Sequence, residues 1–185
     1  FVGIATEGTA PGPVTTRSDT VVYFGPGLPT NNFSWTNSIR WRQFTLYGLV
    51  SVERGAWFGN GDRAYRVRQG GSDEYLSTLD ASGNRTFKSD SIAQWASILN
   101  YIDKRDNVRL RELSVAWNVP ASLTSRFGMG MTSFTLSGQN IWWWDDCNCV
   151  DPNMNWAGAS SFTFNNGFLM QPAPRVVRLQ LRTRF

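Results

Sequence analysis

The C-terminal stretch "PRVVRLQLRTRF", Pro174 to Phe185, alternates apolar and basic residues with a period of two. One parity carries Val177, Leu179 and Leu181, and the other carries Arg178, Arg182 and Arg184. Successive side chains of a strand point to opposite faces, so the pattern predicts a strand with one apolar and one basic face. Three arginines cannot all enter a dry core without a heavy desolvation cost. The basic face therefore has to meet water or counter-charges.

Four earlier segments repeat the two-residue period. They are 33–41, 44–53, 108–119 and 131–144, each with an apolar and a polar parity. The parity changes between the first two segments, across Arg42 and Gln43, which predicts a hairpin or a bulge. It changes again within the third segment, near Arg111, which predicts a bulge.

The segments outside these strands lack the two-residue period and differ from one another in composition. Residues 1–30 are rich in Gly, Pro, Thr and Ser and are expected to be loop or extended chain. Residues 61–105 are polar and irregular, with one short helix expected over "DSIAQWASILNYI", Asp90 to Ile102, capped by Ser89 or Asp90. A long loop is expected from Asp145 to Ala173.

The fold class is all-β, with about five antiparallel strands of about 10 to 14 residues and alternately short and long connections. Strands of soluble sandwiches have about 5 to 6 residues, whereas tilted transmembrane strands need about 9–11. Transmembrane barrels also combine short turns on one side with long loops on the other. The pattern favours a membrane barrel. The alternative is a soluble sheet whose charged edge strand prevents aggregation.

The composition excludes several functions. The chain has 185 residues, a net charge of +4 and no histidine, so the commonest general base and metal ligand is missing. Lys88 and Lys104 are the only lysines among 18 basic residues, and the arginines are scattered instead of forming the basic tract typical of nucleic-acid binding. No apolar run approaches the ~20 residues of a membrane-spanning helix. We expect no enzyme, no cofactor and no nucleic-acid partner.

The stretch "NIWWWDDCNCVDPN", Asn140 to Asn153, runs from aromatic into acidic residues. Aromatic rings favour the headgroup layer of a membrane, so we expect Trp142 and Trp144 there. Trp143 has the opposite parity and could instead stack on a sugar or another ligand. Asp145 and Asp146 then begin the loop, either as solvated acids or as ligand contacts. As neighbours on a strand end they point apart, which is poor geometry for shared catalysis.

The two cysteines of this stretch, Cys147 and Cys149, leave alternatives open. Thiolates and carboxylates both bind metals, but without histidine or a second cysteine pair the zinc signal is weak. We expect a solvated acidic loop without a metal, and a strained or intermolecular disulfide is the remaining alternative.

Several motifs together resemble a known family. The run from Asn107 to Asn155 contains an "RLREL" strand that ends at Pro120, then "LSGQN" with following aromatics, then "DPNMN". This order is similar to the C-terminal signature of SusC/RagA-type TonB-linked outer-membrane receptors, and residues 25–60 and the final "RLQLRTRF" resemble the same family. The similarity covers roughly residues 25 to 185. The Cys-x-Cys insertion and the extra tryptophan have no counterpart in that signature.

The resemblance implies a large barrel of about 22 strands around a plug, with long outer loops. Residues 1–30 would be an outer loop or extended segment, and residues 31–185 the C-terminal strands. Five strands cannot close such a barrel, so the plug and the remaining strands would complete it. The C-terminal Phe185 would be the signal for the assembly machinery, with the C-terminus in the periplasm.

The implied function is TonB-dependent import of oligosaccharides or peptides across the outer membrane. The implied partners are membrane lipid, the rest of the receptor, the TonB complex through the N-terminal part, and a surface lipoprotein lid. The aromatic girdle would comprise Trp35, Trp41, Trp117, Trp142 and Trp144. The lumen-facing arginines, Arg178, Arg182 and Arg184, would be solvated or would contact acidic groups of the plug. Two other functions stay open: a soluble, Trp-rich β-sandwich that binds carbohydrate, and a structural barrel component of a surface assembly.

Overall fold

The computed structural model describes residues 2–4, 21–96, 101–156 and 166–184. The chain divides into two compact units, which are described separately below. The first comprises residues 1–30, 54–106 and 146–172, and the second comprises residues 31–53, 107–145 and 173–185. The predicted signal residue Phe185 lies outside the described residues.

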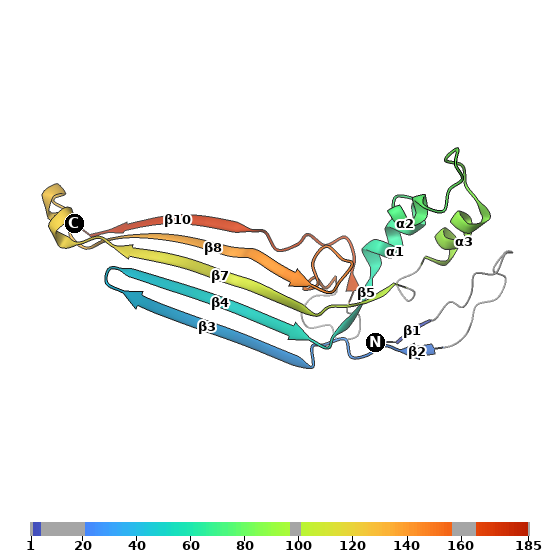
Figure 1. The fold of residues 1–185 in the computed structure, drawn as a ribbon, viewed down its shortest axis with the longest axis horizontal. Coiled ribbons are helices and arrows are strands. Elements are labelled where there is room, and N and C mark those ends of the chain that lie inside the picture. The colour runs from blue at the N-terminus through green and yellow to red at the C-terminus, as the bar shows by residue number, and fades with distance from the viewer. Residues whose placement is uncertain (1, 5–20, 97–100, 157–165, 185) are drawn as a thin grey trace. The chain divides into compact units, whose positions relative to one another are not determined.

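The second unit is one antiparallel sheet of five strands, in the order β10-β8-β7-β4-β3 (Figure 1). The strands are β3 (Asn31–Trp41), β4 (Phe44–Arg54), β7 (Asn107–Asn118), β8 (Thr132–Asp145) and β10 (Val176–Thr183). The number of strands and the length of four of them confirm the sequence prediction, whereas β10, with 8 residues, is shorter than predicted. The edges of the sheet are β3 and β10.

The connections alternate between short and long, as predicted. β3 and β4 are joined by a turn at Arg42 and Gln43, in which Arg42 adopts a positive φ of 51°. β7 and β8 are joined through α4 (Ala121–Thr124) and a 3-10 turn, Ser125–Phe127. Both short connections leave one end of the sheet, because Phe44 pairs with Trp117 and Trp117 pairs with Phe134. The long connections, 55–106 and 146–175, leave the other end.

A bulge interrupts the middle of the sheet at the predicted place. Gln139 pairs with Glu112 and Trp142 with Leu110, so two residues of β8 face Arg111 alone. The first of the two, Asn140, has a φ of 51°, which asparagine tolerates better than most residues. The side chain of Arg111 reaches β4, where Nε donates to Ser51 Oγ at 2.8 Å and the guanidinium pairs with Glu53 at 3.3 Å.

Arg111 is also an extra residue of β7 opposite β4, where Leu49 pairs with Glu112 and Val50 with Leu110. Apolar residues of both β7 parities therefore lie on one face of the sheet. The register gives five rows on that face, starting at the short-connection end: Phe44–Trp117–Phe134–Leu181, Leu46–Val115–Leu136–Leu179, Gly48–Leu113–Gly138–Val177, Val50–Leu110–Trp142 and Val52–Val108–Trp144. The opposite face carries Thr45, Tyr47, Ser114, Glu112, Ser137, Gln139, Arg178 and Gln180 in the intervening rows. Each face is therefore chemically uniform over most of its length.

The first unit holds a small core and the helices. Its strands are β1 (Val2–Ile4), β2 (Val21–Tyr23), β5 (Trp57–Asn60), β6 (Ile102–Lys104) and β9 (Asn166–Gly167), and its helices are α1 (Gly61–Arg68), α2 (Asp73–Leu76) and α3 (Phe87–Trp95). β5 lies between β6 and β9. The buried apolar residues are Ala56, Phe58, Ala64, Val67, Tyr75, Ala96 and Met154.

The predicted short helix exists as α3, but its predicted start was wrong. Thr86 is the N-cap: its Oγ1 accepts from Ser89 N–H at 3.2 Å, and Ser89 Oγ accepts from Thr86 N–H at 2.9 Å. This reciprocal capping box places the start of the helix at Phe87 and makes Ser89 its third residue. The C-terminal part of the predicted helix, residues 97–100, lies outside the described residues, and Ile102 begins β6.

Two further helices, α1 and α2, lie in a segment that was expected to be irregular. Each begins with a polar cap, Asn60 for α1 and Ser72 for α2. α1 buries only Ala64 and Val67 beside its first glycine, which is too little apolar periodicity to be recognised in a polar sequence. None of the helices in the described ranges has the length and apolarity needed to cross a membrane.

The bulge explains a glycine in the "LSGQN" motif and gives a first prediction. A Cβ atom on Gly138 would lie 2.8 Å from Cγ2 of Ile141, whereas one on Gly48, in the same row, would meet only Leu113 at 4.0 Å. We therefore expect Gly138→Ala to reduce the free energy of unfolding by about 1–3 kcal/mol, because the β-branched Ile141 cannot move away without disturbing the bulge.

The matched control is Gly48→Ala, for which we expect no loss or a small gain, since alanine restricts the unfolded chain. Urea unfolding followed by tryptophan fluorescence measures both. Equal losses from the two substitutions would contradict this role of Gly138.

Candidate functional site

The apolar face of the five-stranded sheet is exposed to an extent unusual for a folded protein. Leu179 is 74% exposed, Val177 72% and Trp41 64%. Every buried apolar residue in the described ranges belongs to the other unit. The sheet therefore has an apolar face without an apolar core behind it. Contiguous exposed patches of this kind mark contacts with a membrane or another protein.

The height of this face fits the hydrocarbon layer of a membrane. From Trp117 to Val108, β7 advances nine residues, which is about 30 Å at about 3.3 Å per residue. A tilt of about 40°, usual for barrel strands, reduces the height to about 23 Å. The apolar band of outer-membrane barrels is about 25 Å tall.

Aromatic residues gather at both ends of the apolar face. At the short-connection end, Trp117 stacks between Phe44 and Phe134, with ring centroids 6.3 and 5.9 Å away, and Phe44 stacks on Trp41 at 6.4 Å. At the other end lie Trp142 and Trp144, both half exposed. Four of the five predicted girdle tryptophans thus lie at the ends of the face. The fifth, Trp35, lies on the same face of β3, nearer the long-connection end.

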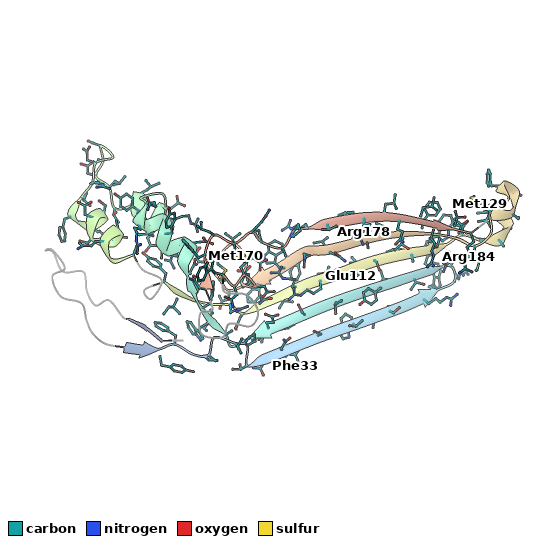
Figure 2. The ribbon with its side chains drawn as sticks, turned by 180° about the vertical axis from the view of Figure 1, so that it is seen from behind. Phe33, Glu112, Met129, Met170, Arg178 and Arg184 are labelled. Atoms are coloured by element: carbon teal, nitrogen blue, oxygen red, sulfur yellow. A yellow bond between two sulfur atoms is a disulfide. The ribbon has the colours of Figure 1, made fainter. Side chains whose placement is uncertain are left out.

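The opposite face carries the predicted arginines. Arg178 lies in the row of Tyr47, Ser114 and Ser137, and Arg182 pairs with Ser133. Arg184 follows the end of β10, where its carbonyl accepts from Gly130 N–H at 2.7 Å and its N–H donates to Met131. Figure 2 shows Arg184 beside Met129 at this end and Phe33 at the other end of the sheet.

A recess of about 460 Å³ opens on this face at the short-connection end. Three of the side chains that line it are guanidinium groups, from Arg40, Arg182 and Arg184. The sequence prediction missed Arg40. The available signal was its parity, since residue 40 alternates with the apolar Ile39 and Trp41 and so belongs to the polar face.

Trp143 points to the polar face, as its parity predicted, and pairs with Arg109. The guanidinium carbon of Arg109 lies 5.2 Å from the centre of the Trp143 ring, and that of Arg175 lies 4.6 Å away. Both are cation–π distances. The contact between Arg175 and Trp143 holds the segment before β10 against β8. A ligand would have to stack on a ring that already has two cationic neighbours. The ligand role of Trp143 stays a prediction.

The acidic stretch after Trp144 spans the two units. Asp145 ends β8 and pairs with Asn107, and the backbone N–H of Asp146 donates to the carbonyl of Asp106 at 3.0 Å. The side chain of Asp146 is exposed and that of Asp145 partly buried. Their predicted ligand role is neither supported nor opposed by these contacts.

Cys147 and Cys149 form a disulfide with each other, with Cα atoms 5.2 Å apart. The sulfur atoms are thus unavailable as thiolate ligands. In the described ranges no group of three acidic, cysteine or histidine side chains could hold a metal ion. The small ring that the disulfide closes contains Asn148, whose carbonyl accepts from Nδ2 of Asn60 at 2.8 Å.

Asn60 is the centre of a polar network in the first unit. This buried side chain caps α1 by accepting from Arg63 N–H at 3.0 Å, and it donates to Asp103 at 2.7 Å as well as to the disulfide ring. Arg63 then pairs with Glu74 at 3.1 Å and with Asp103 at 3.7 Å. The network joins β5, α1, α2, β6 and the disulfide ring, so it fixes the long connections to one another.

Tyr101 completes this network. Its hydroxyl donates to Glu74 Oε1 at 3.3 Å, and the guanidinium of Arg63 lies 4.9 Å from its ring centre. Burial, and then the charge of Glu74, raise the pKa of Tyr101 to about 12.

The class that this geometry defines is a section of transmembrane β-barrel wall: long antiparallel strands, one apolar face bounded by aromatic rings, and one polar face. Two of three comparisons with known proteins agree with this class. No family model matches the chain. The chain is 23% identical over 183 residues to TonB-dependent receptor P26 of Formosa agariphila, a match that covers 91% of this chain and 18% of that protein.

The fold is that found in solved structures of the RagAB peptide importer. One chain of its open-open state superposes with a TM-score of 0.74 and 18% identity, over 100% of this chain and 22% of that chain. The closed-closed state gives 0.68 and 17%, over 90% and 18%. A further structure of the RagAB peptide transporter gives 0.73 and 15%, over 98% and 22%.

The similarity to TonB-dependent receptors that the motifs predicted is confirmed, and so is the all-β fold. The relatives are a receptor and an importer, not enzymes, in agreement with the absence of a predicted catalytic site. The chain spans about a fifth of the length of the proteins it matches.

The network around Tyr101 gives a second prediction. The folded protein holds the Tyr101 proton more tightly than the unfolded chain, whose tyrosines titrate near 10, so stability is expected to fall as the pH rises from about 10 to about 12. Tyr101→Phe should abolish this dependence, and Glu74→Gln should lower the pKa of Tyr101. The tyrosinate absorbance of the wild type minus that of Tyr101→Phe measures the transition. A difference titration centred near 10 would contradict the burial argument.

Asn60 gives a third prediction. Asn60→Ala removes the cap of α1 and two further hydrogen bonds, and the carboxylate of Asp103 loses one of its hydrogen-bond donors. We therefore expect the free energy of unfolding to fall by about 2–4 kcal/mol. Ser72→Ala, which removes only the cap of α2, should cost about 1 kcal/mol. Urea unfolding measures both, and hydrogen exchange should show faster exchange at residues 146–151 in the Asn60 variant alone. Equal changes in the free energy of unfolding and in hydrogen exchange for Asn60→Ala and Ser72→Ala would contradict the role of Asn60 as the centre of the polar network.

Proposed function

We propose that this chain is part of the wall of a TonB-dependent importer in the bacterial outer membrane. The five strands form a section of a barrel of about 22 strands, with the apolar face toward lipid and the polar face toward the lumen. Residues 31–185 supply this section, and residues 1–30 belong to an outer segment. The observation that carries the proposal is the apolar face, which runs over all five strands.

The free energy of transferring apolar side chains out of water favours lipid as the surroundings of the apolar face. Burying one large aliphatic side chain is worth about 1.5–3 kcal/mol, and the face exposes many of them. A soluble sandwich would cover them with a second sheet, and its strands would contribute to a shared core. In the described ranges the sheet contributes no residue to the buried apolar core. The described residues therefore do not supply the second layer that the soluble carbohydrate-binding alternative needs.

The connections suggest an orientation. Barrels of the outer membrane have short periplasmic turns and long outer loops. On this rule the Arg42–Gln43 turn and the β7–β8 connector face the periplasm, together with the C-terminus. The first unit, with its helices and disulfide, then belongs to the outer loops, and a disulfide is chemically stable there. The tryptophans at the two ends of the apolar face form the interface girdles.

The transported substrate is proposed to be an oligosaccharide or a peptide. The RagAB importer of similar fold takes peptides, and the match to a TonB-dependent receptor supports energy supply by the TonB complex. We further propose a surface lipoprotein as the lid, and Trp143, Asp145 and Asp146 as the residues of this chain closest to a passing ligand. A purely structural role in a surface assembly is the second candidate, and an uptake assay separates the two.

A charge on the lipid face tests the proposal. Leu113 lies in the middle row of the apolar face and Ser114, the next residue, lies on the polar face. In the full-length receptor we expect Leu113→Arg to cost about 2–4 kcal/mol, the penalty for arginine at the bilayer midplane, and Ser114→Arg to cost under about 1 kcal/mol. Urea unfolding of the receptor in lipid vesicles measures the difference.

Fractionation provides the coarser check. The receptor should remain with the outer membrane in high salt and at alkaline pH, and detergent should be needed to extract it. Release without detergent, or an equal cost for the two arginine substitutions, would refute the membrane orientation.

A further inference from the structure

The disulfide between Cys147 and Cys149 is too local to hold distant parts of the fold together. A single residue separates the two cysteines, and the ring that they close lies within one loop after β8. A disulfide stabilises a fold mainly by restricting the unfolded chain, and this effect grows with the length of the loop that it closes. The smallest rings therefore gain the least. What this ring fixes in the folded chain is the conformation of the residue inside it, Asn148.

The chain is held on both sides of the ring. Before it, the backbone N–H of Asp146 donates to the carbonyl of Asp106 at 3.0 Å. After it, Asp151 is only 1% exposed, and its carboxylate accepts a backbone N–H at 2.9 Å. Residues 147–150 are therefore a short bridge between two fixed points, and the ring determines where the carbonyl of Asn148 points.

The carbonyl of Asn148 contacts a buried side chain. It accepts from Nδ2 of Asn60 at 2.8 Å, and Asn60 is 1% exposed. The side chain of Asn60 also donates to Asp103 at 2.7 Å and accepts from Arg63 N–H at 3.0 Å, by which it caps α1. One hydrogen bond thus connects the ring that the two sulfur atoms close to the start of a helix.

Small thiols have access to this disulfide. Both cysteines are only partly buried, and Asn148 between them is exposed. Exposed disulfides are among those that thiols reduce readily. In the reduction, one thiolate attacks a cysteine sulfur and forms a mixed disulfide, and a second thiolate then displaces the protein from it. The products are two cysteine thiols and the disulfide of the reductant, so electrons and protons balance.

We propose that Cys147 and Cys149 form a thiol-sensitive switch that controls the attachment of residues 147–150 to α1. In the disulfide form the ring presents the Asn148 carbonyl to Asn60. Reduction by a low-molecular-weight thiol or dithiol opens the ring, the bridge gains conformational freedom, and the hydrogen bond to Asn60 is lost. The inference does not depend on the proposed function, because all of these contacts lie within the first unit.

A redox titration of the full-length protein tests the switch, because coupling between two events is reciprocal: removing the bond to Asn60 must make the disulfide easier to reduce. Mixtures of reduced and oxidised dithiothreitol set the potential, an alkylating reagent traps the thiols, and mass spectrometry of the peptide containing both cysteines gives the reduced fraction. Asn60→Ser keeps a good helix cap but is too short to reach Asn148. We expect its ratio of reduced to oxidised protein to be about fivefold higher, a shift of about 20 mV.

The matched control is Ser72→Ala. Ser72 caps α2 by accepting from Tyr75 N–H at 3.1 Å, so its loss should leave the potential unchanged. Three results would overturn the proposal: an unchanged potential in Asn60→Ser, an equal shift in both variants, and a disulfide that excess dithiothreitol leaves intact.

Hydrogen exchange gives a second test that leaves Asn60 in place. When the wild type is reduced, the amide of Arg63 and the peptide covering residues 147–151 should lose protection, whereas the amides of β7 should keep theirs. Cys147→Ser combined with Cys149→Ser should show the reduced pattern without thiol and should not respond to it. Loss of protection in β7 as well would make the disulfide a general structural support, and unchanged protection at Arg63 would separate the ring from the helix cap. Either result contradicts the switch.

Discussion

The structure depends on one constraint: an apolar face that spans five strands and is covered by no layer of its own unit. A soluble sheet satisfies its apolar face with a second layer, and the buried apolar residues of the described chain all lie elsewhere. On the proposed function, lipid covers this face in place of a second protein layer. If lipid covers one face, as proposed, the backbone groups must pair with neighbouring strands, in keeping with long antiparallel strands whose register shifts only near Arg111.

The bulge at Arg111 allows apolar residues of both parities of β7 to lie on the same face of the sheet. Arg111 is the extra residue of β7 opposite β4, and without it Val108 and Leu110 would lie on the polar face, because they have the opposite parity to Leu113. The bulge moves them back to the apolar face and directs Arg111 to Ser51 and Glu53 on the neighbouring strand. Two residues of β8 accommodate the bulge. Asn140 adopts a positive φ, and Gly138 leaves room for the side chain of Ile141.

The sheet could be predicted from sequence and the first unit largely could not. Strict alternation over ten or more residues has few interpretations, so the strands, the bulge near Arg111 and the polar position of Trp143 followed from parity alone. The helices α1 and α2 bury few side chains, Ala64 and Val67 in α1 and Tyr75 in α2, and begin at the caps Asn60 and Ser72, which are weak signals within a polar segment. The disulfide was only one of several alternatives. Parity places Arg40 on the polar face, but it does not show that Arg40 of one edge strand shares a recess with Arg182 and Arg184.

The central claim is that alternate residues of the sheet face lipid and water. Spin labels placed singly at residues 176–183 of the receptor in a bilayer test it most directly, through collisions with oxygen, which concentrates in lipid, and with a water-soluble nickel chelate. Oxygen contact should peak at positions 177, 179 and 181, and nickel contact at 178, 180 and 182. Nickel contact at all eight positions, or no alternation in either reagent, would contradict a lipid-facing wall.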